Sequence, residues 1–219
     1  QPAPLRAGAF AWGFAVVPVL AVFAGARYAA ALRELGLQSL SAAIGAPLVE
    51  DALRLAGVLG ALTLASRRRI TAMDGAVYGL LVGAGFEVAE NLSYVLGEDD
   101  LLGTMRIALL RIGVGFGLHA LWTAIAGAAL AACLSRKQAG QGGRWAILVP
   151  GVLAPMMLHA LWDAPALSIA PGAQLAALAL VYAASLALFA LAAIAGRRAE
   201  AAEPREPSER FGRSPDGSP

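Results

Sequence analysis

Cysteine is almost absent from the sequence. The single one, Cys133, lies in an apolar run, so neither a disulfide framework nor a thiolate zinc site can form within the chain. Charge is scarce as well: 15% of the 219 residues are charged, and 17 basic residues nearly balance 15 acidic ones. Because the basic residues are scattered at the ends of apolar segments instead of forming one stripe, nucleic acid is not an expected partner.

The sequence also lacks the signatures of two common hydrolase classes. It has no Gly-x-Ser-x-Gly elbow and no serine next to a base, so an acyl-enzyme mechanism has no candidate nucleophile. It has only two histidines, and they do not form the His-Glu-x-x-His pair of the zinc proteases. For a hydrolase built from this chain, direct attack by water is the expected chemistry.

Long apolar stretches are what the sequence has in abundance. Hydrophobic residues make up 58% of the chain and the mean hydropathy is +0.66, which disfavours a water-soluble globule. A helix needs about 20 apolar residues to cross a bilayer. The first stretch is long for a signal peptide, so we interpret it as a spanning helix. We predict an all-α, polytopic transmembrane helix bundle of about six spans, over residues 7–26, 40–66, 70–96, 107–134, 146–167 and 170–196.

The loops predict an orientation, because cytoplasmic loops carry an excess of lysine and arginine. Three basic groups alternate along the chain with the acidic loop at residues 98–100, although Arg27 and Arg33 in the first external loop oppose the pattern. We therefore expect a multi-pass protein of the cell membrane with both termini in the cytoplasm. Residues 1–198 would form the helical domain, and the proline-rich, charged residues 199–219 a disordered cytoplasmic tail. The basic groups are residues 67–69, the loop with Arg136, Lys137 and Arg144, and the pair Arg197 and Arg198.

Ionisable residues inside the predicted spans are the most informative feature of the sequence. An unpaired charge at the centre of a bilayer costs roughly 3 kcal/mol, so such residues must face inward and pair, and they are usually functional. Four of the predicted helices carry them. They are Glu50, Asp51, Arg54, Glu87, Glu90, Arg111 and Asp163, together with both histidines, His119 and His159.

Spacing and depth predict that these side chains meet in one cavity. Glu50 and Arg54 are four residues apart, as are His159 and Asp163, so each pair shares a helix face. In the predicted topology Glu90 lies late in an outward-running helix, whereas His119 lies early in the inward-running helix that follows. All of them would therefore gather in the outer half of the membrane.

Two chemistries fit such a cavity. A carboxylate in a poorly hydrated site can act as a base on water, and two imidazoles can polarise a carbonyl or stabilise an oxyanion. The alternative is a metal site, in which His119, His159 and a carboxylate, with Glu90 as the candidate, would bind zinc with one position open. We expect no cofactor, but this reasoning leaves zinc open.

Four short motifs follow one another on consecutive spans. Residues 49–54, Val-Glu-Asp-Ala-Leu-Arg, resemble a Glu-Glu-x-x-Lys motif, with Asp51 and Arg54 as substitutions of like charge. Residues 86–94 contain the pattern Phe-x-x-x-Glu-Asn-x-x-Tyr, formed by Phe86, Glu90, Asn91 and Tyr94.

The other two motifs contain the histidines. Arg111 precedes His119 by eight residues, and His159 is followed by Asp163. With these motifs the chain resembles the PrsW family of intramembrane glutamic-type proteases, in the superfamily of the CAAX prenyl endopeptidases. The resemblance covers the second to fifth spans. It implies a protease of the lipid bilayer that cleaves single-pass membrane proteins, typically anti-sigma factors, near the extracytoplasmic face.

The resemblance also implies roles for individual residues. Glu50 would be the leading base and Asp51 its acidic neighbour, although the shorter aspartate side chain puts a catalytic role at that position in question. Arg54 and Arg111 would form ion pairs with Glu50 or Glu87, or contact substrate. The catalytic candidates are Glu50, Asp51, Glu90, His119 and His159, and the supporting ones are Arg54, Phe86, Asn91, Tyr94, Arg111 and Asp163.

Other interpretations remain open at this stage. The same buried acids and histidines would suit a proton-coupled carrier, although no two-half repeat of broken helices is present. A catalytically silent membrane scaffold is a second alternative, and a CAAX-like prenyl peptidase a third. We interpret Glu87 as a cavity wall or an arginine partner, and the repeated tetrapeptide His-Ala-Leu-Trp at His119 and His159 as chance. We expect six glycines to permit close helix packing, namely Gly75, Gly79, Gly83, Gly113, Gly115 and Gly117.

Overall fold

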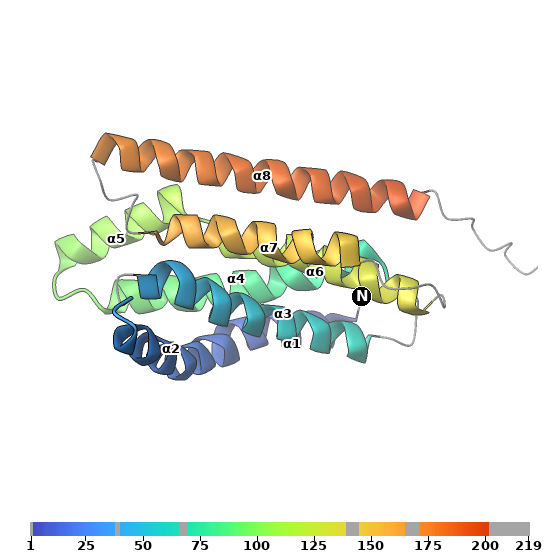
Figure 1. Cartoon of the computed structure of the whole chain (residues 1–219), viewed down its shortest axis with the longest axis horizontal. Coiled ribbons are helices and arrows are strands. Elements are labelled where there is room, and N and C mark those ends of the chain that lie inside the picture. Colours follow the sequence, from blue (N-terminus) through green and yellow to red (C-terminus); the bar gives the residue numbers. More distant parts are fainter. Residues whose placement is uncertain (1, 38–39, 66–69, 139–144, 165–170, 202–219) are drawn as a thin grey trace, which may run out of the picture.

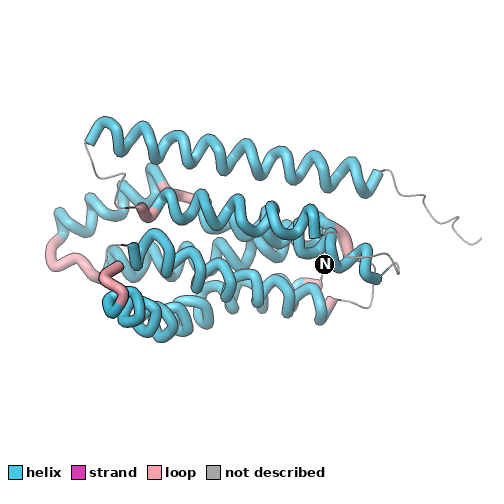
Figure 2. Tube along the Cα trace, in the orientation of Figure 1, coloured by secondary structure: helices cyan, strands magenta, loops and turns pink. Residues whose placement is uncertain are grey.

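A computed structural model describes the chain except residues 1, 38–39, 66–69, 139–144, 165–170 and 202–219. The described part consists of helices and short connections, with no strand in it (Figure 2), which confirms the predicted all-α class. The elements are α1 (Ala3–Ala11), η1 (Trp12–Val16), α2 (Val17–Glu34), η3 (Ser41–Gly45), α3 (Ala46–Leu64), α4 (Ala72–Leu96), α5 (Leu101–Val114), α6 (Leu118–Gln138), α7 (Trp145–Trp162) and α8 (Pro171–Ala201).

The helices pack side by side into an elongated bundle (Figure 1). Five helical stretches and α3 make up this bundle. The five stretches are long and apolar enough to cross a membrane, within the described residues: 3–34, 72–96, 101–135, 145–162 and 172–198. The sixth is α3, which has 19 residues and lies against α2, α4, α6 and α7. Three charged residues, Glu50, Asp51 and Arg54, lie within its 19 residues, so its place in the bundle follows from its packing. The chain is thus a multi-pass membrane protein.

The two described ends of the chain lie at the same end of the bundle (Figure 1). This agrees with termini on one side of the membrane, while their predicted cytoplasmic location stays a prediction. The last helix continues to Ala201, and residues 202–219 of the expected tail lie outside the described residues. The expected basic groups at residues 67–69 and at Arg144 also fall outside them.

The predicted span over residues 107–134 is wrong as a single helix. The structure ends α5 at Val114 and begins α6 at Leu118. Between them Gly117 has a φ of +86°, a left-handed conformation that costs glycine little and interrupts a right-handed helix. The break places His119 in the first turn of α6.

A row of glycines on α4 lets it approach α6 closely. A Cβ atom at Gly75 would overlap the carbonyl of Gly127, one at Gly79 that of Thr123, and one at Gly83 that of His119. Both rows advance four residues at a time, so α4 presents a small-xxx-small face to the backbone of α6. Close packing is therefore confirmed for these three glycines and for Gly115, where a Cβ would lie 3.0 Å from the Trp162 ring. It is wrong for Gly113 and Gly117, where a Cβ would meet no atom within 4 Å.

Replacing Gly79 by alanine is expected to lower the free energy of unfolding by about 1–3 kcal/mol, because the added methyl group forces α4 and α6 apart. Denaturation in detergent micelles, followed by the loss of helical circular dichroism, measures this. Gly60→Ala on α3 is the matched control, because a Cβ there meets no atom within 4 Å. Equal stability of the Gly79 variant and the wild type would contradict the tight contact.

Candidate functional site

The ionisable side chains meet at the end of the bundle opposite the chain termini, between α3, α4, α6 and α7. Glu50 lies in the second turn of α3, where Pro47 begins the helix without needing an amide partner. Glu90 comes from the end of α4, and His119 from the start of α6. His159 comes from the last turn of α7. The prediction that one region collects these residues is confirmed by their contacts.

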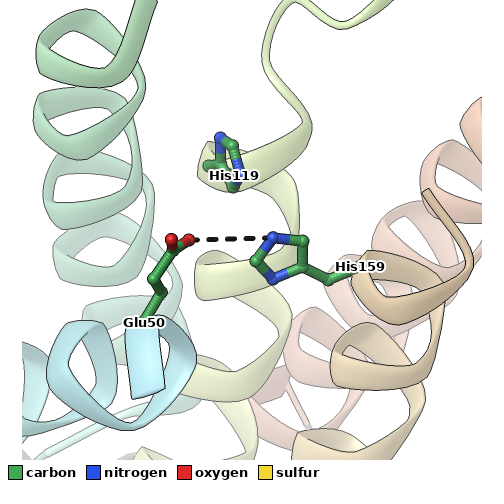
Figure 3. Close-up of side chains that lie close together, drawn as sticks. All are labelled: Glu50, His119 and His159. Carbon is green, nitrogen blue, oxygen red and sulfur yellow. Dashed lines mark ion pairs between the residues drawn. The ribbon is translucent and has the colours of Figure 1, made fainter. Parts of the chain in front are cut away.

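Glu50, His119 and His159 form the centre of the site (Figure 3). The Oε2 atom of Glu50 lies 3.8 Å from Nε2 of His159, and one atom from each of the three residues fits within 4.8 Å of the others. Both histidines are buried, with exposed fractions of 5% and 1%. Glu50 Oε2 is also buried and has no hydrogen-bond partner in the described structure, so this carboxylate oxygen is available to a water, a substrate or a metal ion.

Carboxylates face both ring nitrogens of His159. Its Nδ1 lies 3.3 Å from both oxygens of Asp51, and its Nε2 lies 3.4 Å from Oδ2 of Asp163. Contacts of Nδ1 with Asp51 and with the Arg54 guanidinium, which lies 3.2 Å away, fix the ring and leave Nε2 directed at Glu50 and Asp163. Asp51 thus orients His159, and Asp163 contributes a second acid beside the reactive nitrogen.

Arg54 is completely buried next to this pair. Its guanidinium forms an ion pair with Asp51, donates from Nε to the backbone carbonyl of Glu50, and lies 4.8 Å from the ring centroid of Phe86. The predicted pairing of Arg54 with Glu50 or Glu87 is therefore wrong. The partner is Asp51, one turn back on the same helix face, and this leaves Glu50 Oε2 without an arginine partner and without a hydrogen bond.

Arg111 organises a second polar cluster at the edge of the site. It forms an ion pair with Glu90, donates to the side-chain oxygen of Asn91, and stacks 4.1 Å above the ring of Tyr94. Here too the predicted partner, Glu50 or Glu87, is wrong. Glu90 Oε2 also lies 3.5 Å from Nδ1 of His119, so Glu90 connects Arg111 to the centre.

Two aromatic rings hold the histidines. Trp122 stacks on His159 at a centroid distance of 4.8 Å and donates from Nε1 to the Ser185 hydroxyl on α8. Phe86 meets the His119 ring edge-on at 5.1 Å. Sequence reasoning did not select Trp122, although the repeated His-Ala-Leu-Trp tetrapeptide contains it and is the signal that leads to it.

A cavity of about 90 Å³ adjoins the centre on the α5 side, with Glu87, Asn91, Arg111 and His119 among its polar lining. A buried water needs roughly 10–15 Å³ of such space and two to four polar partners, so this cavity has room for several waters. Water can therefore reach His119 even though the ring itself is buried.

The donor set at the centre fits a zinc ion. Catalytic zinc sites use three protein ligands of the nitrogen and oxygen type and keep one position open. Glu50, His119 and His159 match that description, and the unpaired Oε2 of Glu50 supplies an anionic ligand. The carboxylate grouped with the histidines is Glu50, whereas the predicted ligand Glu90 is engaged by Arg111.

Comparison with known proteins identifies one family. A family model described as PrsW family intramembrane metalloprotease matches residues 1–193, which run from α1 into α8. The search of curated proteins found no match. The search of solved structures found none either.

Proposed function

The chain belongs to the PrsW family of intramembrane proteases, and from this premise we propose that it cleaves single-pass membrane proteins of the anti-sigma-factor kind. Cleavage would occur at the bundle end that carries Glu50, His119 and His159, which we assign to the extracytoplasmic face of the cell membrane. The attacking group is water activated by a carboxylate.

One observation carries this proposal: a buried carboxylate oxygen without a partner lies beside two buried imidazoles. Leaving a buried polar atom unsatisfied costs about 1–3 kcal/mol, and beside two imidazoles this cost is compensated when the oxygen binds water, a substrate or a metal ion. A purely structural cluster would pair Glu50 as it pairs Asp51 and Glu90. Arg54 pairs with Asp51 and Arg111 pairs with Glu90. No arginine pairs with Glu50 Oε2 among the described residues.

The mechanism follows from the positions of these groups. Glu50 Oε2 accepts a proton from water while the water oxygen bonds to the carbonyl carbon of the scissile peptide. His119 and His159 donate hydrogen bonds to the developing oxyanion. Asp51 holds the His159 ring from the far side. The proton on Glu50 then passes to the departing amine as the C–N bond breaks, with Asp163 as a second proton carrier at His159 Nε2.

Glu50, His119 and His159 would also hold the metal that the family description names. When bound, zinc would supply a water of lowered pKa and a Lewis acid for the carbonyl. Asp51 would help to hold the metal as well, since an acid that accepts a hydrogen bond from the second ring nitrogen of a ligating histidine fixes the orientation of that histidine.

The test is a cleavage assay with the purified protein in lipid vesicles and a panel of single-pass membrane proteins. We expect the wild type to cut a subset of them near one membrane face. Cleavage that is lost on chelation and restored by zinc would assign the three central residues as metal ligands, while chelator-resistant cleavage would leave Glu50 itself as the base. If nothing in the panel is cut while a partner protein co-purifies, the chain is a scaffold and the proposed function is wrong.

A further inference from the structure

Glu87 is a buried acid that the proposed mechanism does not use. Its exposed fraction is 5%, and its Oε1 atom accepts a hydrogen bond from the backbone amide of Gly117, thirty residues further along the chain. Neither arginine of the site pairs with it among the described residues. Of the two sequence-based interpretations of Glu87, the arginine partner is therefore wrong, whereas the cavity wall is confirmed, because Glu87 lines the cavity on the α5 side. Its side chain also reaches the start of α6.

The start of α6 needs an acceptor from elsewhere in the fold. The first amides of a helix have no intrahelical partner and are normally capped by a nearby Ser, Thr, Asp or Asn side chain. The residues before α6 are Gly115, Phe116 and Gly117, none of which has a side chain that accepts a hydrogen bond. Glu87 of α4 supplies this missing cap, and the amides of His119 and Ala120 lie next to the same carboxylate. Its negative charge is also favourable at the positive end of the helix dipole.

His119 is the second residue of α6. The contacts that position the first turn of α6 therefore also position the His119 ring. One turn earlier on α4, the hydrogen atoms of Gly83 leave room for the His119 carbonyl. The ring lies between Phe86 and Trp122, with His159 at a centroid distance of 5.1 Å. The alignment of these rings depends on where α6 begins, and Glu87 fixes that point.

We propose that Glu87 is a positioning residue that places the His119 ring for the reaction by capping the first turn of α6 from α4. It touches neither substrate nor the reacting atoms. The effect on catalysis rests on the proposed function, but the effect on the His119 ring does not.

The test uses the presence of just two histidines in the chain. The full chain is labelled with ¹⁵N and ¹³C in histidine alone and placed in detergent micelles, so NMR shows two sets of ring signals. His159→Ala identifies the set of His119. We expect Glu87→Ala to shift or broaden the His119 signals and to leave those of His159 in place. Glu87→Gln should resemble the wild type, because its amide oxygen still accepts the Gly117 hydrogen bond.

Tyr182→Phe is the matched control. It removes one hydrogen bond, from the Tyr182 hydroxyl to the carbonyl of Phe116, in the same connection between α5 and α6. It leaves the helix cap intact and should not move the His119 signals. Unchanged His119 signals in Glu87→Ala would overturn the proposal. An equal shift in Tyr182→Phe, or a joint shift of both histidines in Glu87→Ala, would also overturn it, because each would indicate a general structural role.

On a substrate that the wild type cleaves, Glu87→Ala should lower kcat about 10- to 100-fold with little change in KM, since a misplacement of about 1 Å can cost that much. Glu87→Gln should recover most of the rate. Loss through KM alone, or no recovery by glutamine, would count against positioning. If the wild type cleaves nothing, the proposed function fails, and the NMR comparison still decides the role of Glu87.

Discussion

Replacing Glu50 by glutamine is expected to abolish cleavage, with a fall in kcat/KM of about 1000-fold or more. The amide keeps the size of the side chain but cannot accept a proton from water, and removing a general base costs roughly 100- to 10,000-fold. Glu50 Oε2 is buried without a hydrogen bond 3.8 Å from His159, whereas Glu90 is engaged by Arg111, so Glu50 is the carboxylate best placed to act on water between the two histidines. A neutral amide is also a much weaker metal ligand. The loss is therefore expected whether Glu50 acts as the base or as a ligand.

The assay compares wild type, Glu50→Gln and Glu34→Gln in the same vesicles. Glu34 is exposed at the end of α2, so its variant removes one negative charge without touching the site and should cleave like the wild type. Because Glu50 Oε2 forms no hydrogen bond, the Glu50 variant should fold with unchanged or slightly higher stability. Full activity in Glu50→Gln would remove Glu50 from the mechanism and favour a scaffold.

Replacing His159 by alanine has the second largest expected effect, a loss of about 100- to 1000-fold in kcat. That is the usual cost of removing one group that stabilises an oxyanion. His159 contacts more of the site than its neighbours do. Asp51 lies at its Nδ1, Asp163 lies at its Nε2, and the Trp122 ring stacks on its face. Without the imidazole, two acids lose their common partner and the Trp122 ring loses its support.

This variant needs a measurement that separates chemistry from folding. Removal of a buried ring lowers stability by a few kcal/mol, so the thermal midpoint in micelles should fall. Cleavage is therefore measured well below that midpoint, with Met157→Ala as a control on the exposed side of the same helix. We expect the control to retain full activity. A His159 variant that is folded at the assay temperature and cleaves at the wild-type rate would contradict the assigned role.

The sequence was sufficient to predict the helical bundle and the group of residues at its polar end. The reason is energetic, because a charge inside a bilayer must find a partner, and the depth of each residue in its span restricts which partners are within reach. Glu50, Glu90, His119 and His159 were therefore predictable as neighbours. Their roles in catalysis remain predictions.

The individual pairings were not predictable for a different physical reason. Arg54 has acids three and four residues back on its own helix, and helical spacing permits both contacts. The structure selects Asp51, because the guanidinium must also reach the Glu50 carbonyl and cover the Phe86 ring. The break at Gly117 was not predicted for a similar reason, because three glycines in an apolar run are compatible with a continuous helix. The left-handed backbone of Gly117 and the cap from Glu87 show where α6 starts.

The polar character of α3 has a consequence for how the protein is made. Three charged residues of α3 oppose insertion, each by up to about 3 kcal/mol at the centre of a bilayer, so we do not expect α3 to enter the bilayer favourably by itself. Asp51 neutralises Arg54 locally, but the acceptors and rings that complete the site belong to α4, α6 and α7, which the ribosome synthesises later. We therefore expect stable integration of α3 to wait for its neighbours, so that the cluster of Glu50, His119 and His159 assembles in the same event that completes the membrane topology. A chain truncated after α3 is expected to leave this segment at the membrane surface.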